Sequence, residues 1–137
     1  MQAYISVSYS KRKHLDKELL TIIECLNEFK ILPFIFVDKH KFDLSQEKEM
    51  MLQAMADIDN SDILIAETSN KGIGIGIEVG YAKAKGKPLI YLRNQNAEHS
   101  TTVSGICDFQ IIYKNIHDLK NQLIHTFSKI TSSNTVQ

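Results

Sequence analysis

The sequence predicts an α/β fold, a three-layer sandwich in which helices cover both faces of a five-stranded parallel sheet with flavodoxin-like strand order. The first observation behind this prediction is that five short apolar segments alternate with longer segments whose apolar residues recur at helical spacing. The second is that the short segments are almost continuously apolar, which is typical of strands buried on both faces of a parallel sheet. Right-handed connections between such strands place helices on both sides of the sheet.

The first half of the chain supplies two of the strands and two of the helices. Residues 3–7 (AYISV) and residues 32–37 (LPFIFV) are the first two apolar segments. Between them, apolar residues at helical spacing predict a helix over residues 15–29 with one buried face. After a polar loop at residues 38–43, we expect a second helix from about residue 45 to residue 60.

The second half supplies the remaining three strands. Residues 62–67 and residues 87–92 are apolar segments, and a glycine-rich loop and a helix separate them. Residues 94–105 are polar and predict a loop, and residues 109–113 (FQIIY) predict the fifth strand. This order continues the alternation of strands and helices that is typical of a parallel sheet.

We expect one domain that spans residues 1–130 and ends with a helix over residues 116–130. The chain has 137 residues, which is enough for one domain with one core. Residues 131–137 are polar, and we expect them to form a flexible tail.

Charge and composition argue against several classes of function. The 16 basic and 16 acidic residues give a formal net charge of zero, whereas a general nucleic-acid binder needs a basic excess. The two cysteines do not form a CxxC pair, so we expect no structural zinc site. No charged N-terminal region precedes an apolar stretch, and no run approaches the roughly 20 apolar residues of a membrane helix. We therefore expect a cytoplasmic protein whose partners include neither nucleic acid nor a membrane.

The loop between the third and fourth strands carries the residues that point most directly to chemistry. Gly72, Gly74 and Gly76 alternate with isoleucines, and glycines remove side chains from the space above a helix N-terminus. Glu78 follows just inside the start of the expected helix. The glycines lack the GxGxxG spacing of a dinucleotide-binding turn and follow the third strand instead of the first, which argues against that kind of site.

Two interpretations of Glu78 stay open on physical grounds. A carboxylate in the first turn of a helix complements the helix dipole and contributes about 0.3–1 kcal/mol of stability. Alternatively, Glu78 is a catalytic carboxylate that the helix N-terminus keeps ionised at neutral pH, as a nucleophile requires.

The carboxyl ends of the first three strands should converge on one crevice that also contains the glycine loop. Residues 6–13 bring hydroxyls and a basic cluster to this crevice, and the cluster is either a solvated loop or an anion site. His40, with Asp38 and Asp43 nearby, is an acid, a metal ligand or a solvated loop histidine. Phe42 either stacks on a heterocyclic base or packs on its own domain.

Residues 62–92 carry a motif that is specific enough to indicate a family. An apolar strand ends in the carboxylate of Glu67, a glycine-bearing loop follows, the sequence EVGYA begins at Glu78, and a Lys-Pro pair precedes the next strand. This motif resembles the core motif of the nucleoside 2-deoxyribosyltransferase superfamily. The eleven-residue step from Glu67 to Glu78 is most similar to the branch of 2'-deoxynucleoside 5'-phosphate N-hydrolases.

The resemblance implies a reaction and a nucleophile. In that family the residue that matches Glu78 attacks the anomeric carbon and forms a glycosyl-enzyme intermediate, which water or an acceptor base resolves, as in retaining glycosidases. The first expectation is an N-glycosidase that cleaves the base–sugar bond of a nucleoside 5'-monophosphate without a metal or other cofactor. The alternatives are base exchange between deoxynucleosides, cleavage of a nicotinamide–ribose bond, and a non-catalytic nucleotide-binding module of the same fold.

The resemblance also implies how the substrate, a small nucleotide or nucleoside, is held. Hydroxyls and backbone amides after the first strand bind the phosphate or the sugar. A polar segment near residues 100–102 reaches the site of a neighbouring subunit, which implies a homodimer or larger assembly with shared active sites. The expected substrate-binding residues are Tyr4, Ser6, Ser8, Tyr9, Ser10, Arg12, Asp57, Gly72, Gly74, Gly76, Thr101 and Thr102.

The chain departs from the family pattern at residues that assist the nucleophile. The family places an aspartate eight residues before the aspartate that opens the third strand, and this position is Ala54 here. Asp57, one turn later on the same helical face, is the residue that could replace it. The phosphate-binding serine of the hydrolase loop corresponds to Gly72. These departures leave open a changed substrate, slow chemistry, or a binding protein that retains the fold.

Overall fold

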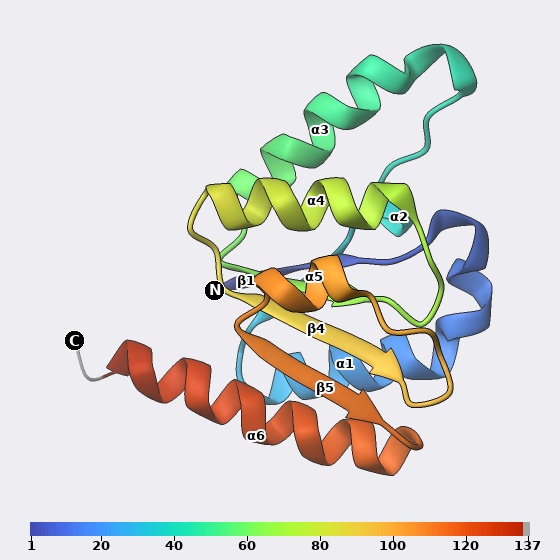
Figure 1. The fold of residues 1–137 in the computed structure, drawn as a ribbon. Coiled ribbons are helices and arrows are strands. Elements are labelled where there is room, and N and C mark those ends of the chain that lie inside the picture. Colours follow the sequence, from blue (N-terminus) through green and yellow to red (C-terminus); the bar gives the residue numbers. More distant parts are fainter. Residues whose placement is uncertain (136–137) are drawn as a thin grey trace.

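The computed structural model describes residues 1–135, and these form a parallel sheet between two layers of helices (Figure 1). The strands are β1 (Gln2–Ser6), β2 (Leu32–Ile35), β3 (Ile63–Glu67), β4 (Leu89–Asn94) and β5 (Phe109–Tyr113). The α-helices are α1 (Asp16–Glu28), α2 (Phe36–Lys39), α3 (Glu47–Asp59), α4 (Ile73–Ala84), α5 (Thr101–Ile106) and α6 (Ile116–Thr135). Two 3-10 helices are η1 (Tyr9–Leu15) and η2 (Leu44–Gln46).

The strand order is β2-β1-β3-β4-β5, and all neighbouring strands are parallel. The predicted three-layer α/β sandwich with a five-stranded parallel sheet and flavodoxin-like strand order is therefore confirmed. Ser6 pairs with Ala66, and Glu67 pairs with Leu92, so β1, β3 and β4 end at the same edge of the sheet. The segments that follow these strands gather at this edge, where ligands of open α/β sheets bind.

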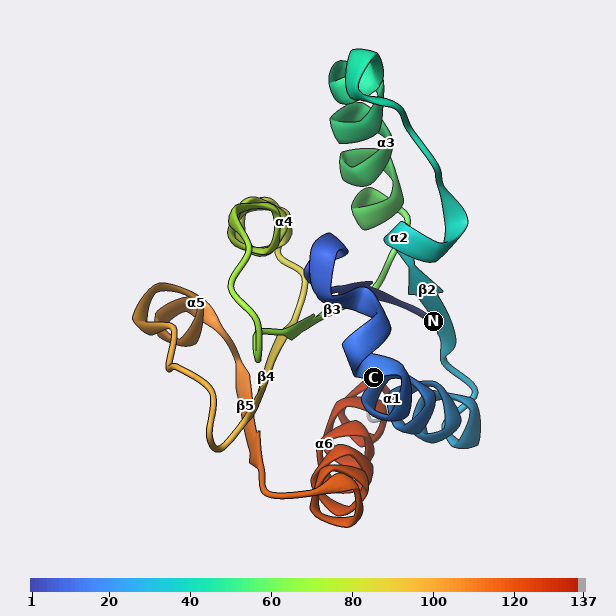
Figure 2. The same cartoon turned by 90° about the vertical axis from the view of Figure 1, so that its right-hand side faces the viewer.

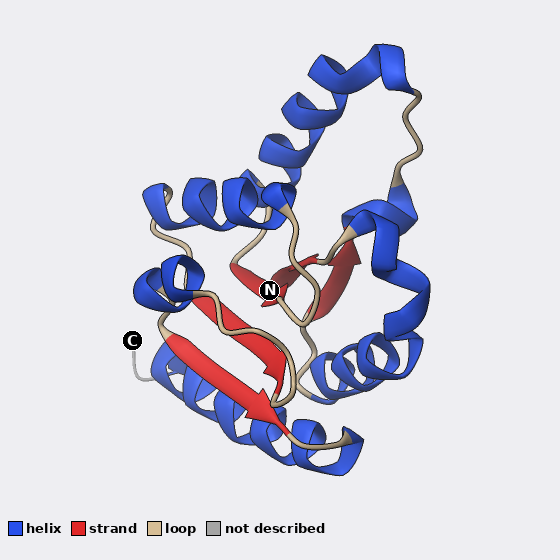
Figure 3. Ribbon diagram, turned by 45° about the vertical axis from the view of Figure 1, so that its right-hand side comes forward, coloured by secondary structure: helices blue, strands red, loops and turns tan. Residues whose placement is uncertain are grey.

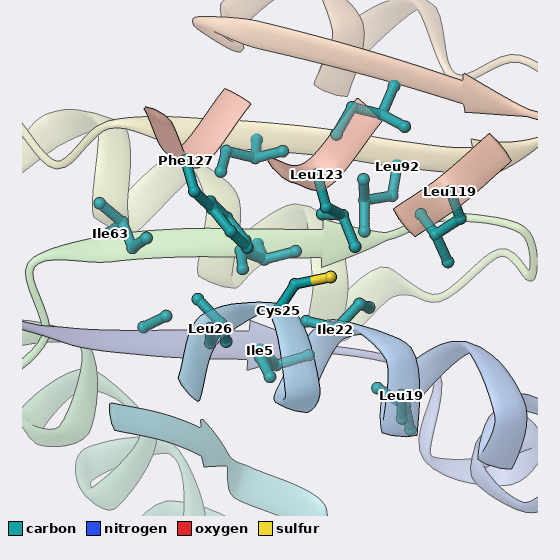
Figure 4. Close-up of a cluster of buried hydrophobic side chains, with 14 of the residues drawn as sticks. Ile5, Leu19, Ile22, Cys25, Leu26, Ile63, Leu92, Leu119, Leu123 and Phe127 are labelled. Atoms are coloured by element: carbon teal, nitrogen blue, oxygen red, sulfur yellow. The ribbon is translucent and has the colours of Figure 1, made fainter. Parts of the chain in front are cut away.

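One face of the sheet is covered by α1 and α6 (Figure 2). Their apolar faces meet side chains of the central strands in a single cluster (Figure 4). The labelled members of this cluster are Ile5, Leu19, Ile22, Cys25, Leu26, Ile63, Leu92, Leu119, Leu123 and Phe127. Cys25 is fully buried there, so its thiol is part of the core.

The opposite face is covered by α3, α4 and α5, and this layer positions the site. α4 packs on the sheet through Ile75, Val79 and Ala82. α3 packs mainly through its carboxyl-terminal half, and its amino-terminal end extends away from the sheet (Figures 1 and 3). Of its 13 residues, Ala54 and Ile58 are buried.

Two segments differ from the prediction. The central strands β1, β3 and β4 are buried on both faces as expected, but the edge strand β2 is half-exposed. Because β2 has a neighbour on one side only, residues 36–37 are not held as a strand and begin α2 instead. Residues 101–106, predicted as loop, form α5, because the Ser100 hydroxyl accepts a hydrogen bond from the Val103 amide at 3.3 Å and Val103 is buried.

The carboxyl-terminal helix is longer than predicted. α6 continues to Thr135, so residues 131–135 of the expected flexible tail are helical. The hydroxyls of Thr131 and Ser132 donate to the carbonyl oxygens of Phe127 and Ser128, one turn earlier, at 2.8 and 2.7 Å. Residues 136–137 of that tail lie outside the described residues, and the domain boundary at residue 130 stays a prediction. No helix within residues 1–135 is both long and apolar enough to cross a bilayer.

Candidate active site

Glu78 lies in the second turn of α4, a helix that begins at Ile73. The first turn of α4 contains no acidic residue. The prediction that Glu78 lies just inside the helix start is therefore wrong by about one turn. Because the helix dipole acts mainly on the first turn, the dipole interpretation of Glu78 loses its basis.

Two hydroxyls from β1 hold the Glu78 carboxylate. The Tyr4 hydroxyl donates to Oε2, and the Ser6 hydroxyl donates to Oε1 at 3.1 Å. Tyr4 and Ser6 are two positions apart on the strand, so their side chains point to the same face of the sheet. Both residues are buried. The structure thus brings together three residues that the sequence predicted for the site.

Burial and hydrogen bonding act on Glu78 in opposite directions. Burial raises the pKa of the Glu78 carboxyl, and the bonds from Tyr4 and Ser6 lower it because they stabilise the charged form. Burial and the adjacent Glu78 carboxylate raise the pKa of the Tyr4 hydroxyl, which therefore stays protonated and can donate. The charge on Glu78 is thus favoured by two side-chain hydroxyls, whereas the sequence predicted the helix N-terminus for this role.

Glu78 borders a cavity of about 770 Å³ at the carboxyl edge of β1 and β2. Gly72 and Gly74 line it on one side, and a Cβ built at Gly74 would meet no atom within 4 Å. The residues that line it after β1 are Val7, Ser8, Tyr9 and Ser10. A cavity of this size accommodates a small organic ligand of several rings and polar groups.

Aromatic side chains form another wall of this cavity. Phe36, His40 and Phe42 line it, and the ring centroid of His40 lies 4.9 Å from that of Phe36 and 5.8 Å from that of Phe42. The rings of Phe36 and Phe42 also contact each other, with centroids 6.2 Å apart, and Tyr4 packs behind them with its centroid 6.2 Å from that of Phe36. A cluster of rings is suited to stacking against a planar heterocycle. Sequence analysis missed Phe36 because the continuous apolar segment assigned it to the second strand.

Comparison with known proteins establishes the family. The family model for nucleoside 2-deoxyribosyltransferase matches residues 4–130. The chain belongs to this family. The resemblance drawn from residues 62–92 is therefore confirmed, and the protein is an enzyme of the nucleoside glycosidase or deoxyribosyltransferase type. No curated protein matches the chain in sequence.

Solved structures with this fold agree with the family assignment. The CMP N-glycosidase BcmB of Clostridium botulinum is 20% identical, with a TM-score of 0.62, and the match covers 90% of this chain and 98% of that one. A 2-deoxyribosyltransferase of Bacillus psychrosaccharolyticus is 14% identical, with a TM-score of 0.68 and coverage of 93% and 96%. A conserved protein of Enterococcus faecalis is 13% identical, with a TM-score of 0.72 and coverage of 92% and 98%. At these identities the likeness is one of fold.

The position that holds an aspartate in the family pattern borders the cavity, and it is Ala54 in this family member. Asp57 lies behind the cavity wall, where its Oδ2 is 2.9 Å from Nε2 of His40. Its Oδ1 accepts a hydrogen bond from the Gln53 side chain at 3.0 Å. Asp57 therefore reaches the cavity through His40, which does line it.

Arg12 is engaged by carboxylates and does not line the cavity. Its Nε and Nη2 donate to the two oxygens of Asp38 at 2.9 and 2.8 Å, and Nη1 donates to Asp16 at 2.6 Å. The ionic pairs raise the pKa of the Arg12 guanidinium. The basic side chain that does line the cavity is Lys71, which also pairs with Glu98 at 2.8 Å.

Thr101 and Thr102 line a second hollow of about 450 Å³ on the other side of the α4 start. Gly76 borders this hollow, and Gly72 and Lys71 border both hollows. Within one chain the two threonines are therefore separated from the Glu78 cavity by the glycine loop.

Another carboxylate, Glu67, is fully buried at the end of β3. Its Oε2 accepts the Tyr113 hydroxyl at 2.7 Å, and its Oε1 accepts the Ser69 amide at 2.6 Å. It lines neither hollow. Within residues 1–135, no group of three or more His, Cys, Asp or Glu side chains is arranged to hold a metal ion.

Proposed function

We propose that the protein is an N-glycosidase that cleaves the base–sugar bond of a nucleoside 5'-monophosphate, with Glu78 as the nucleophile. The observation that carries this proposal is the Glu78 carboxylate at the cavity wall, held through both oxygens by Tyr4 and Ser6. A carboxylate fixed in this way is oriented for attack on a carbon in the cavity.

The reaction proceeds in two displacements. An Oε atom of Glu78 forms a bond to C1' of the sugar while the C1'–N bond breaks, and the electron pair leaves with the base. Water then attacks C1', the ester bond to Glu78 breaks, and the carboxylate is regenerated. Tyr4 donates to one carboxylate oxygen and Ser6 to the other, so the attacking and leaving oxygen has one hydroxyl donor in both steps.

The walls of the cavity support a nucleotide as the substrate. The aromatic cluster formed by Phe36, His40 and Phe42 suits a base, and the hydroxyls of residues 8–10 suit the phosphate or the sugar. Lys71 supplies a positive charge at the same cavity. The fold shared with a CMP N-glycosidase is consistent with a monophosphate substrate. Because Arg12 is paired with Asp38 and Asp16, we expect the phosphate to contact Lys71 and the hydroxyls of residues 8–10 instead of Arg12.

A second function, a non-catalytic nucleotide-binding module, has one observation in its favour. Ala54 borders the cavity where an aspartate is expected, so the site lacks that carboxylate. Base exchange between deoxynucleosides is the enzymatic alternative, since it uses the same nucleophile and differs only in the acceptor.

We also propose a homodimer or larger assembly in which neighbours share sites. Ile73 and Ile77 on α4 are 85% and 51% exposed, and Ile73 lines the hollow that holds Thr101 and Thr102. A second copy placed there would cover this apolar surface, and Thr101 and Thr102 of one copy would approach the Glu78 cavity of the other. Light scattering over a concentration series tests the assembly, and the Ile73→Asp substitution should shift it toward monomer.

A substrate panel tests the function. Nucleoside monophosphates, nucleosides and NAD are incubated with the protein, and free base is followed by chromatography. Release from monophosphates that is lost in Glu78→Gln, together with a glycosyl adduct on Glu78 seen by mass spectrometry, supports the proposal. Glu67→Gln is the matched control. Release that needs a second base supports exchange, and nucleotide binding with no release supports the binding module.

A further inference from the structure

A nucleobase that leaves C1' carries an electron pair and needs a proton, and the water that follows must lose one. Glu78 cannot supply this proton, because it is the nucleophile of the proposed reaction. The Ala54 methyl group, at the cavity wall, has no proton to exchange. The site therefore needs a second ionisable group that faces the cavity.

His40 is the residue that fits this need. Besides Glu78, the ionisable side chains that line the cavity are Tyr9, His40, Asp43, Glu47 and Lys71. Tyr9, Glu47 and Lys71 are exposed to solvent, and the Asp43 carboxylate caps η2 by accepting the Ser45 amide at 2.9 Å. The His40 side chain is 27% exposed and is held by Asp57 and by the neighbouring aromatic rings.

The fixation of His40 is specific. Nε2 lies 2.9 Å from Oδ2 of Asp57, whose side chain is 13% exposed, and the other oxygen of Asp57 is held by Gln53. The imidazole ring packs against both Phe36 and Phe42, which also contact each other in the aromatic wall. A carboxylate that accepts from one ring nitrogen fixes the tautomer and leaves the other nitrogen to exchange a proton. Within residues 1–135 no group bonds to Nδ1 of His40.

We propose that His40, oriented by Asp57, is the acid–base catalyst of this site, an inference that rests on the proposed N-glycosidase function. In the first displacement the proton on Nδ1 passes to the base as the C1'–N bond breaks, and the base leaves neutral. In the second displacement the neutral Nδ1 accepts a proton from water as the water oxygen bonds to C1' and the Glu78 ester bond breaks. Both groups return to their starting states.

The location of His40 supports this role independently of its pairing with Asp57. The base must lie where its faces can stack, and His40 is part of the aromatic wall that offers such stacking. A proton donor within that wall acts on the base, whereas Tyr4 and Ser6 act on the nucleophile. Asp57 is then a positioning residue, because it acts through His40.

The test compares two leaving groups. A pyrimidine or purine monophosphate needs a proton when its base departs, whereas nicotinamide mononucleotide releases neutral nicotinamide from a pyridinium and needs none. In His40→Gln we expect the first-turnover rate to fall about 10²-fold to 10⁴-fold on the former and less than about 10-fold on the latter. Asp57→Asn should show the same selectivity with a smaller loss. Thermal melting verifies that both variants fold, and His40→Asn serves as a second substitution.

The outcomes separate this inference from the proposed function. If wild-type protein releases base, Glu78→Gln does not, and both His40 variants lose activity equally on the two leaving groups or lose less than about 3-fold, His40 is not the acid–base catalyst and the N-glycosidase proposal stands. If Glu78→Gln retains full activity, or wild-type protein releases no base from any substrate, the proposed function fails and this inference fails with it.

Discussion

Glu67 is fully buried and Glu78 is half-buried, and the two carboxylates have similar hydrogen-bond partners. Each accepts a hydrogen bond from a buried tyrosine hydroxyl, Tyr113 for Glu67 and Tyr4 for Glu78. The second donor is the Ser69 amide for Glu67 and the Ser6 hydroxyl for Glu78. Burial raises the pKa of both carboxyls. Perturbed carboxyls of this kind are often taken as markers of an active site.

The difference between them lies in access. Glu67 lies on the face covered by α1 and α6, borders neither hollow, and ties the chain after β3 to β5 through Ser69 and Tyr113. Glu78 lies on the opposite face and borders the 770 Å³ cavity. A shifted pKa therefore reports burial in both cases, and only the cavity distinguishes a reactive carboxylate from a structural one.

The nucleophile substitution should give the largest difference between the two carboxylates. Glu78→Gln keeps the size of the side chain but removes the nucleophilic charge, so base release should fall about 10⁴-fold or more. Its amide oxygen can accept from only one of Tyr4 and Ser6, which now donate to the two carboxylate oxygens. Glu67→Gln should leave kcat of the folded protein within about 10-fold of wild type. Initial rates on the preferred monophosphate measure both. Equal losses in the two variants would contradict the distinction by access.

The two tyrosines sharpen the comparison. Tyr4→Phe removes a donor from the nucleophile and should lower kcat by about 10-fold to 10³-fold. Tyr113→Phe removes a donor from a buried structural carboxylate and should cost about 1–3 kcal/mol of unfolding free energy with little change in kcat. Rates and urea unfolding curves on the same preparations separate these effects. A kcat loss in Tyr113→Phe that matches that in Tyr4→Phe would show that Glu67 also serves the reaction.

The pH dependence of stability follows from the raised pKa of Glu78. The unfolded value is near 4.5 and the folded value is higher, so between them the folded state binds more protons than the unfolded state. The contribution of this carboxyl is fully present below the unfolded pKa and is lost as pH rises through the folded pKa. Glu78→Gln should therefore be more stable than wild type at pH 7.5, by about 0.5–2 kcal/mol.

Urea unfolding of both proteins between pH 4 and pH 8 measures this difference, which should shrink toward acidic pH. A variant that is less stable than wild type at every pH would show that the charged carboxylate stabilises the fold. In the wild-type enzyme the acid limb of the kcat profile should lie above the usual carboxyl range, because Glu78 must be ionised to react.

The smallest expected effect is on KM and follows from adding a methyl group at Gly74 in α4. Gly74 lines the cavity, and a Cβ there would project into open space, so Gly74→Ala should raise KM about 2-fold to 10-fold by occupying substrate volume. Gly80→Ala is the matched control, because Gly80 lies in the same helix and borders neither hollow. Both variants should gain up to about 1 kcal/mol of stability, since alanine favours the helix. A KM that rises equally in both would assign the effect to the helix instead of the cavity.

The sequence was sufficient to predict the sheet and to single out Glu78 as the residue that we propose as the nucleophile. Continuous apolar segments specify buried parallel strands, and the motif around Glu78 is local, so both can be read from residue order alone. Tyr4 and Ser6 were predicted as substrate-binding residues, and their period-two spacing on a strand could have shown that they share a face. Their bonds to Glu78 depend on how α4 is placed over β1, which spacing does not specify.

Other features of the site depend on loop geometry. His40 and Asp57 are 17 residues apart and meet only because the chain between α2 and α3 turns back. The same applies to Arg12 and Asp38, which are joined across 26 residues, so the charge of Arg12 is paired in a way that composition cannot reveal. Sequence patterns describe single elements well, and these contacts lie between elements.

The uneven burial of α3 bears on which bases the cavity could accommodate. Ala54 and Ile58, in its carboxyl-terminal part, are buried, whereas Met50 and Met51, nearer its free end, line the cavity and are half-buried. Tyr4 and Ser6 hold the Glu78 carboxylate from a central strand of the sheet. The part of the cavity wall that α3 contributes includes unbranched methionine side chains, which adapt readily to different shapes. If Glu78 is the nucleophile, we expect α3 to accommodate bases of different width while the position of the carboxylate is unchanged.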